Sequence, residues 1–213
     1  MTSAPPNGCA SGRPRDPDAD RRILHAAVLE FGDVGYDGLM MERVALRAGV
    51  SKATLYLRWS GRDDLLLACL TGIDLHLAEI DTGSLRSDLR ALATNLAELY
   101  FSDYGRPMLR LLLESGRHSV LAAQSEKIQD AQVMAARSMV RRAIQRGEIP
   151  ADTPVSMVLD GLCGALLNHA LSTPGQLRGQ ARATLPKYVD RLVEFVLGGS
   201  DAVRTRFPAS GRN

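Results

Sequence analysis

Residues 41–59 read MERVALRAGVSKATLYLRW, and this stretch decides how the rest of the chain is interpreted. The small side chains of Ala45 and Ala48 would let two short helices approach each other at a steep angle. Gly49 tolerates the positive φ that a tight turn between them requires, and Ser51 is a suitable N-cap for the second helix. The pattern therefore predicts a helix-turn-helix.

Apolar and polar side chains divide between the two sides of this predicted motif. Val44, Val50 and Leu55 can pack inward and fix the angle between the helices, whereas the polar side chains of the second helix stay outside. Polar groups near the N-terminus of such a helix are suited to reading base edges in a major groove. An ordinary helical hairpin would have the same turn, so the turn by itself leaves both interpretations open.

Positive charge gathers around the turn. The 20 residues from Arg43 to Arg62 contain five Arg and Lys residues and no Asp or Glu, although the formal net charge of the whole chain is only +2. A charge cluster is often only a solvated face, but a local basic face is also what a protein presents to DNA phosphates. Its coincidence with the turn favours DNA binding.

Composition indicates a soluble helical protein. Hydrophobic residues make up 45% of the chain, charged residues 23% and aromatic residues only 5%. Leu and Ala are abundant and β-branched runs are scarce, which favours helices. Cys9, Cys69 and Cys163 are too widely spaced for a disulfide framework or a zinc site. The N-terminal residues lack the apolar core of a signal peptide, and no apolar run approaches the ~18 residues of a membrane span, so we expect a cytoplasmic protein.

Helix caps and breakers predict an all-α fold of about nine helices, with an N-terminal helix-turn-helix domain of three helices and a C-terminal helical domain. Gly32 and Gly35 are expected to end the first helix, and Pro186 to open the last one. The expected boundaries are 1–17 for a disordered arm, 18–64 for the helix-turn-helix domain, 65–200 for the C-terminal domain and 201–213 for a polar tail.

From Arg22 to about Ala68 the chain resembles the tetracycline-repressor (TetR) family of bacterial regulators. The matching positions are Ile23-Leu24-His25-Ala26-Ala27, Phe31, Gly35-Tyr36, Val44-Ala45, Ala48-Gly49-Val50-Ser51, Thr54-Leu55-Tyr56, Trp59 and Arg62-Asp63-Asp64-Leu65-Leu66. The resemblance implies a ligand-responsive repressor that binds a palindromic operator as a homodimer and is released by a small-molecule effector. Repression is the default of the family, and activation stays open.

The residue chemistry and the resemblance together predict where DNA is contacted. The side chains of the second helix would line the DNA, Ser51 and nearby backbone N–H groups would favour a phosphate, and Arg62 would reach a phosphate from the next helix. The DNA-binding residues that we expect are Arg43, Ser51, Lys52, Ala53, Thr54, Tyr56, Arg58 and Arg62.

The entry to the motif departs from the family pattern. The family usually has Thr or Ser just ahead of the first helix of the motif, where this chain has Leu39-Met40-Met41. Methionine cannot accept the capping hydrogen bond, whose loss typically costs ~1 kcal/mol. Whether Met40 and Met41 replace the usual phosphate contact stays open.

The C-terminal two-thirds resembles the ligand-binding and dimerisation region of the family more weakly. If the last two long helices pair across a two-fold axis, the interface would use Val155, Val158, Leu159, Leu162, Leu166, Ala170, Tyr188, Leu192 and Phe195. Candidate ligand contacts among the middle helices are Leu96, Tyr100, Tyr104, Met108, Leu112 and His118. All of these residues could instead fill the core of the subunit. Cys163 could sense oxidation near the dimer axis, or be a buried structural residue.

Two other classes of protein compete with a DNA-binding regulator. A helical enzyme would need a metal or nucleotide motif, and the chain has no HExxH, no GxxxxGK[ST] and no GxSxG. We therefore expect neither an enzyme nor a cofactor. A helical adaptor that binds only proteins is the remaining alternative, but it would not require an acid-free face around Lys52.

Overall fold

The computed structural model describes residues 17–71 and 80–206, and throughout these ranges the chain is helical without strands. The helices are α1 Pro17–Gly38, α2 Met41–Ala48, α3 Lys52–Tyr56, α4 Arg62–Thr71, α5 Leu85–Phe101, α6 Gly105–Glu114, α7 Ser119–Gln145, α8 Val155–Ser172, the short 3-10 helix η2 Gly175–Leu177 and α9 Arg178–Arg206. The predicted all-α fold is confirmed. Most of the expected arm and part of the expected tail lie outside the described residues, while α9 continues into the tail as far as Arg206.

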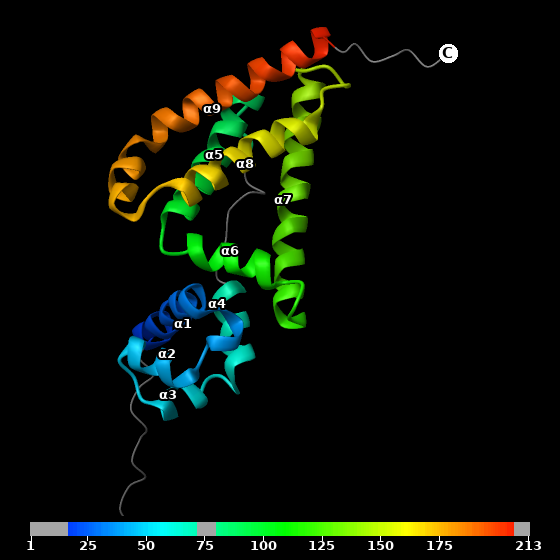
Figure 1. Cartoon of the computed structure of the whole chain (residues 1–213). Helices are drawn as coiled ribbons and strands as arrows, with labels where there is room; N and C mark the ends of the chain where they lie inside the picture. Colours follow the sequence, from blue (N-terminus) through cyan, green and yellow to red (C-terminus); the bar gives the residue numbers. More distant parts are fainter. Residues whose placement is uncertain (1–16, 72–79, 207–213) are drawn as a thin grey trace, which may run out of the picture.

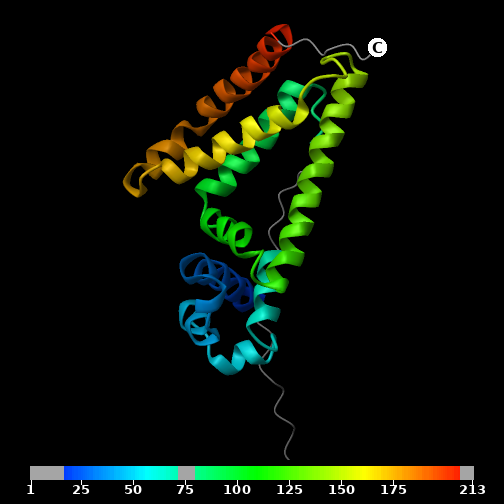
Figure 2. The same ribbon diagram turned by 45° about the vertical axis from the view of Figure 1, so that its right-hand side comes forward.

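The helices form two lobes (Figures 1 and 2). Helices α1 to α4 make the lower lobe, helices α5, α8 and α9 make the upper lobe, and α6 lies between them. The long helix α7 runs along one side and connects the level of α6 with the far end of the upper lobe. The upper core, built from α5, α7, α8 and α9, is separate from the lower core.

The lower core recruits side chains from beyond the first four helices. Val44 and Leu55 of the predicted motif are fully buried in it, as the sequence pattern indicates. Met108 and Leu111 of α6 and Leu121 of α7 are also buried there, each at most 3% exposed. The lower lobe is therefore completed by helices that also connect to the upper lobe.

Helix α1 is longer than the glycine pattern predicts. Gly32 does not end the helix. Its lack of a side chain instead allows Pro107 of α6 to approach closely, because an added Cβ would lie 2.8 Å from the Pro107 ring. Gly35 does interrupt the helix, with a φ of 74°, and one further turn follows to Gly38. The first glycine thus serves the contact between helices, and the second makes a kink.

The prediction for Pro186 was wrong, because α9 begins eight residues earlier, at Arg178. The segment 178–185 is rich in good helix formers, and Leu185 is buried in the upper core, so tertiary contacts favour the helix there. A proline inside a helix removes one backbone hydrogen bond. The helix continues through Pro186 to Arg206 in spite of this loss.

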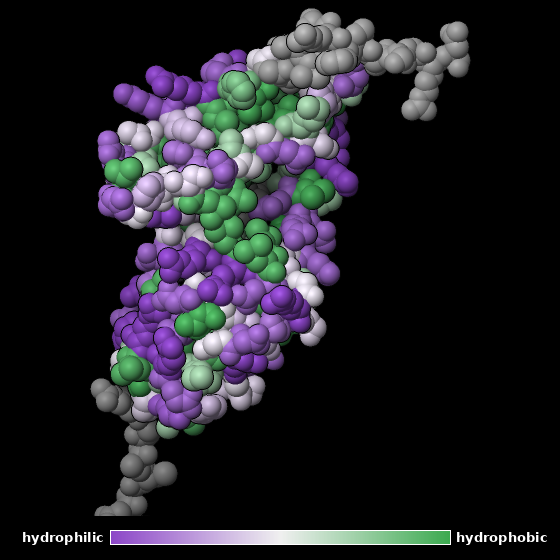
Figure 3. Space-filling model, in the orientation of Figure 1, coloured by the Kyte–Doolittle hydropathy of each residue, from purple (hydrophilic) through white to green (hydrophobic). Residues whose placement is uncertain are grey.

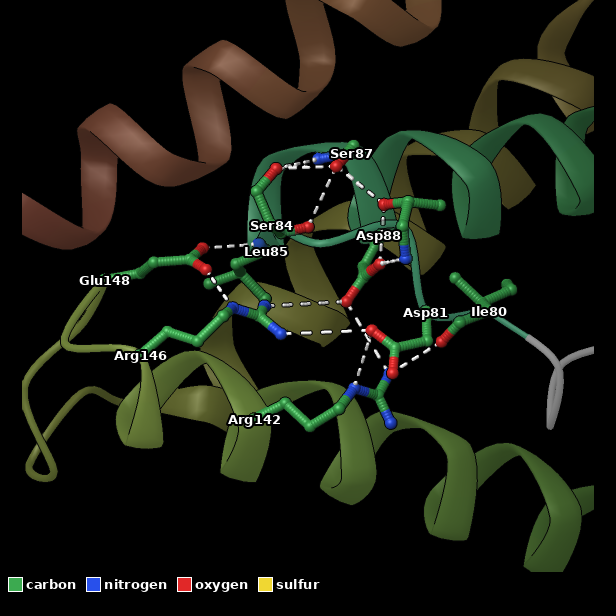
Figure 4. Close-up of polar contacts among 10 residues, drawn as sticks. Ile80, Asp81, Ser84, Leu85, Ser87, Asp88, Arg142, Arg146 and Glu148 are labelled. Carbon is green, nitrogen blue, oxygen red and sulfur yellow. Dashed lines mark hydrogen bonds and ion pairs between the residues drawn. The ribbon is translucent and has the colours of Figure 1, made fainter.

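A buried carboxylate fixes the start of α5 to the end of α7 (Figure 4). Asp88 is fully buried, and its Oδ1 accepts hydrogen bonds of 2.7 Å from both the backbone N–H and the hydroxyl of Thr82. Its Oδ2 lies 3.6 Å from Nη2 of Arg142 and 3.9 Å from Nη2 of Arg146. Glu148 accepts a hydrogen bond from the backbone N–H at the first residue of α5. We call Asp88, Thr82, Arg142, Arg146 and Glu148 the Asp88 cluster.

Candidate nucleic-acid interface

The turn between α2 and α3 has the geometry that the sequence predicts. Gly49 takes the left-handed conformation, with φ 67° and ψ 36°, and its N–H reaches back to the last turn of α2. Ser51 is the N-cap of α3, and its hydroxyl accepts a hydrogen bond of 3.2 Å from the N–H of Thr54. Met40 is the N-cap of α2 and makes no side-chain capping bond, as expected for methionine. Helix α3 itself is shorter than predicted and ends at Tyr56.

Substituting Gly49 by alanine should test how much the turn depends on its backbone. We expect Gly49→Ala to lower the free energy of unfolding by about 1–2 kcal/mol, because an L-residue is strained at this φ. Nothing lies within 4 Å of the added Cβ, so the cost is purely conformational. Urea denaturation measures it. Gly179→Ala, at a helical position of α9 with equally open space, is the control and should lose no stability. Equal losses in both variants would contradict the prediction.

Helix α3 presents a mixed polar and apolar surface to solvent. Lys52 and Ala53 are exposed, and Tyr56 is 52% exposed. Thr54 is half-buried, and its hydroxyl lies 2.8 Å from that of Ser51, within hydrogen-bond distance. An ammonium group and a phenol can bond to base edges or phosphates, and a methyl group suits the methyl of thymine. The exposed face of α3 therefore has the chemistry of a major-groove reader.

Two of the predicted DNA contacts point into the protein instead. The Arg58 side chain is 21% exposed; it pairs with Asp20 of α1 and donates a hydrogen bond of 3.1 Å to the Thr54 carbonyl. Arg62 donates to the backbone carbonyl of Tyr36 at 3.1 Å and lies 4.0 Å from the centroid of that ring. Both arginines brace the lower lobe. Asp20 and Tyr36 lie 38 and 26 residues away from these arginines along the chain, beyond the reach of a local pattern.

Carboxylates from outside the acid-free window neutralise the other basic side chains. Glu30 is buried and pairs with Arg43 at 2.5 Å and with Arg47 at 3.0 Å. Lys52 is paired with Glu42, which lies one residue before the window. The hydrogen bond between them raises the pKa of Lys52 and lowers that of Glu42. A phosphate would therefore compete with a carboxylate for the exposed Lys52.

Polar contacts tie the kinked end of α1 to the helices above it. The carboxylate of Glu114 in α6 accepts a hydrogen bond of 2.9 Å from the N–H of Tyr36, and Arg110 donates to the Gly32 carbonyl at 2.9 Å. The ring of His118, at the start of α7, stacks on Tyr36 with a centroid distance of 4.0 Å. The phenol of Tyr36 donates to Asp63 of α4 at 2.8 Å. Tyr36 thus joins α1, α4, α6 and α7, and we call this set of contacts the Tyr36 junction.

The six predicted ligand contacts do not meet in one cavity. Leu96 lines an open groove of about 820 Å³ between α5, α7 and α8, and Tyr100 lines a cavity of about 500 Å³ between the lobes. Tyr104 borders a third cavity beside α1. The remaining three are Met108 in the lower core, Leu112 at 37% exposure on α6, and His118 in the Tyr36 junction.

The nine predicted dimer residues are likewise divided. Four of them are buried in the upper core of the subunit, which leaves them no surface for a partner: Val158, Leu162, Leu166 and Ala170. Val155 and Leu159 line the groove, Leu192 is half-buried, and Tyr188 stacks on His169 with a centroid distance of 4.1 Å. Phe195 is 77% exposed. Met157 and Leu171 of α8, which were not among the predicted residues, are also exposed, at 61% and 59%.

Helix α8 is long and apolar. Its 18 residues have a mean hydropathy of 1.3, so by length and composition alone the helix could cross a membrane. One face of α8 is buried in the upper core, and the opposite side leaves apolar side chains exposed. Length and composition of one helix are weak grounds for a membrane span.

The two described cysteines are unlike reactive thiols. Burial raises the pKa of Cys163 to about 11 and that of Cys69 to about 12, so both stay protonated at neutral pH. Cys9 lies outside the described residues. Within the described ranges, no group of three or more His, Cys, Asp or Glu side chains could hold a metal ion.

Known proteins resemble both lobes. Residues 23–69 match the family model of bacterial regulatory proteins, tetR family, and residues 79–196 match that of the tetracyclin repressor-like C-terminal domain. The HTH-type transcriptional regulator YdeS of Bacillus subtilis is 30% identical over 165 residues, covering 76% of this chain and 83% of that protein. The DNA-binding transcriptional repressor TetR of Mycobacteroides abscessus is 30% identical over 172 residues, covering 76% and 83%.

A solved structure shares the fold at lower identity. It is the transcriptional regulator FadR of Bacillus subtilis, determined in complex with stearoyl-CoA. The TM-score is 0.64 and the sequence identity 18%, over 84% of this chain and 98% of that one. At this identity the likeness concerns the fold alone.

Proposed function

The chain belongs to the TetR family of helix-turn-helix transcriptional regulators, and from this premise we propose that it represses transcription as a cytoplasmic homodimer bound to a palindromic operator, and releases the operator when a small molecule binds. The observation that carries the proposal is the α2–turn–α3 unit, with its capped α3 and the exposed Lys52 and Tyr56. Repression is supported by the relative from Mycobacteroides abscessus, which is named a repressor.

The proposed DNA contacts separate into readers and braces. Lys52, Ala53 and Tyr56 are the readers, because they are exposed on α3 and can reach base edges. Arg58 and Arg62 act as braces that hold α3 and α4 against α1, through the ion pair with Asp20 and the contact with Tyr36. Arg43 is 56% exposed and can turn from Glu30 to a phosphate.

The proposed dimer surface is the exposed side of α8 together with Phe195 of α9. Met157 and Leu171 lie on α8 with Gly161 and Gly164 between them, and glycines allow two helices to approach closely. Exposed apolar side chains that gather on one face, unlike single ones, are typical of an interface. Two-fold symmetry would then present two copies of α3 to two half-sites of a palindrome.

Substituting Phe195 by glutamate should separate the dimer, because a charge would be buried in an apolar interface. We expect the mass measured by light scattering to fall to that of one chain, 23.1 kDa, and operator affinity to fall with it. Leu113→Glu is the control, since Leu113 is 79% exposed on α6 and lies outside the proposed interface. A dimer that persists in the Phe195 variant would contradict the assignment of this face.

Release of the operator requires that ligand binding in the upper lobe changes the position of α3. The Tyr36 junction supplies a route for this change, because it joins α6 and α7 to α1 and α4. A ligand that shifts α7 would move this junction and change the distance between the two α3 helices of a dimer. Allosteric couplings of about 1–3 kcal/mol are common and change affinity roughly 5- to 150-fold.

Selection of bound duplexes from a random pool tests the proposal. We expect the full chain to enrich a palindrome, with an affinity that falls steeply as salt rises because phosphate contacts release counterions. Enrichment of no sequence, or binding that is insensitive to salt, would overturn the proposal and favour an adaptor that binds only proteins.

A further inference from the structure

An open groove in the upper lobe has an apolar floor made by three helices. Helices α7 and α8 meet at their connection, residues 146–154, and diverge from there, with α5 behind them (Figures 1 and 2). Leu92 and Leu96 of α5 belong to the floor and are at most 6% exposed. The apolar residues that complete the lining are Val133, Ala136, Val140, Ile144, Val155, Leu159 and Cys163. The volume, about 820 Å³, is within the range of small-molecule sites.

The groove lies on a different face of α8 from the proposed dimer surface. Val155, Leu159 and Cys163 line it at intervals of four residues, whereas Met157 and Gly164 lie on the exposed side. A second copy that packs on the exposed side would leave the groove accessible.

Two arginines edge the groove. Arg137 and Arg141 lie one turn apart on α7, are exposed, and make no ion pair with any residue in the described ranges. Their neighbours Arg142 and Arg146 show the contrast, because both are held by acidic residues (Figure 4). Among the residues that the structure describes, the groove therefore has positive charge without an acidic partner beside an apolar floor.

We propose that this groove binds an elongated apolar molecule with one anionic head group, a carboxylate or a phosphate ester, and that Arg137 and Arg141 hold the head group. Guanidinium groups suit both anions, because they donate paired hydrogen bonds. Asp160 of α8 lines the opposite wall and is the carboxylate among the described lining residues, so it repels the head group toward the arginine edge. The apolar chain then lies over Leu92 and Leu96.

The proposal rests on the proposed function only for the consequence of binding, since this ligand would be the effector that releases the operator. Binding itself can be measured without DNA. Calorimetry on the full chain would use dodecanoate and dodecyl phosphate below their micellar concentrations, with dodecanol as the uncharged match. We expect at least one of the two anions to bind, and to bind more tightly than the alcohol.

Variants that change the charge or the shape of the groove test whether the probes bind there. The double variant Arg137→Gln/Arg141→Gln should weaken anion binding about 10- to 100-fold and leave dodecanol binding unchanged. Leu159→Trp, which fills the groove, should abolish binding of all three probes. The control Arg117→Gln/Arg182→Gln removes two exposed arginines outside the groove and should change nothing.

Failure of this inference and failure of the proposed function give different results. No binding of either anion, or anion binding that the Arg137/Arg141 variant does not weaken, would overturn the groove assignment whether or not the chain binds an operator. Conversely, if wild-type protein binds the anions in the groove but selects no operator, the site stands and the DNA-binding proposal fails.

Discussion

The double variant Lys52→Ala/Tyr56→Ala is expected to lose specific operator binding, with a decrease in affinity of at least about 100-fold. Both side chains are exposed on α3, and neither contributes to the lower core. A side chain that reads a base edge contributes about 1–3 kcal/mol of discrimination, so two of them account for most of such a loss. Fluorescence anisotropy with the selected duplex measures the decrease.

Lys127→Ala is the matched control, because it removes an exposed lysine from α7 in place of one on α3. The control should bind the operator as wild type does. The double variant should keep its helix content and oligomeric state, since Val44 and Leu55 still pack the motif. Unchanged operator affinity in the double variant would contradict the role of α3.

Asp88→Ala is expected to destabilise the upper lobe strongly. It would leave Arg142 and Arg146 beside a cavity without their buried carboxylate, and Thr82 without its acceptor. Removing one partner of a buried pair costs about 3–5 kcal/mol. The lower value applies because the two arginine side chains are 25% and 29% exposed. For a chain of this length, the melting temperature should fall by roughly 6–12 °C.

Calorimetric melting of two further variants would identify the cause of that loss. Asp130→Ala removes an exposed carboxylate from α7 and should melt with wild type. Asp88→Asn keeps the volume and an acceptor for Thr82, so its loss should be smaller than that of the alanine variant. If Asp88→Ala and Asp130→Ala melt at the same temperature, the Asp88 cluster does not stabilise the fold.

The local parts of the fold could be predicted from sequence because their causes are local. The cap at Ser51, the left-handed Gly49 and the missing cap at Met40 each depend on one residue and its immediate neighbours. The same reasoning was wrong at Gly32 and Pro186, where contacts between helices outweigh the local preference. Propensity is a weak prior wherever tertiary contacts compete with it.

The candidate site was less predictable because its charges pair across long separations. The acid-free window correctly identified the basic segment, but Asp20 and Glu30 of α1 reach it in three dimensions. A local pattern contains no sign of these pairs. On α8 the difficulty was different: apolar residues lie on the core side and also on the exposed side, so periodicity alone did not separate Val158 from Met157.

The sharing of the lower core with α6 and α7 limits how this regulator can be recombined with others. Met108, Leu111 and Leu121 fill the lower core from beyond residue 100, while the helix-turn-helix unit ends before residue 64. A chimera joined just after the DNA-reading unit would replace these three side chains with those of a foreign sensor. Exchange of operator specificity between relatives should therefore move α6 and the first turn of α7 together with α1 to α4.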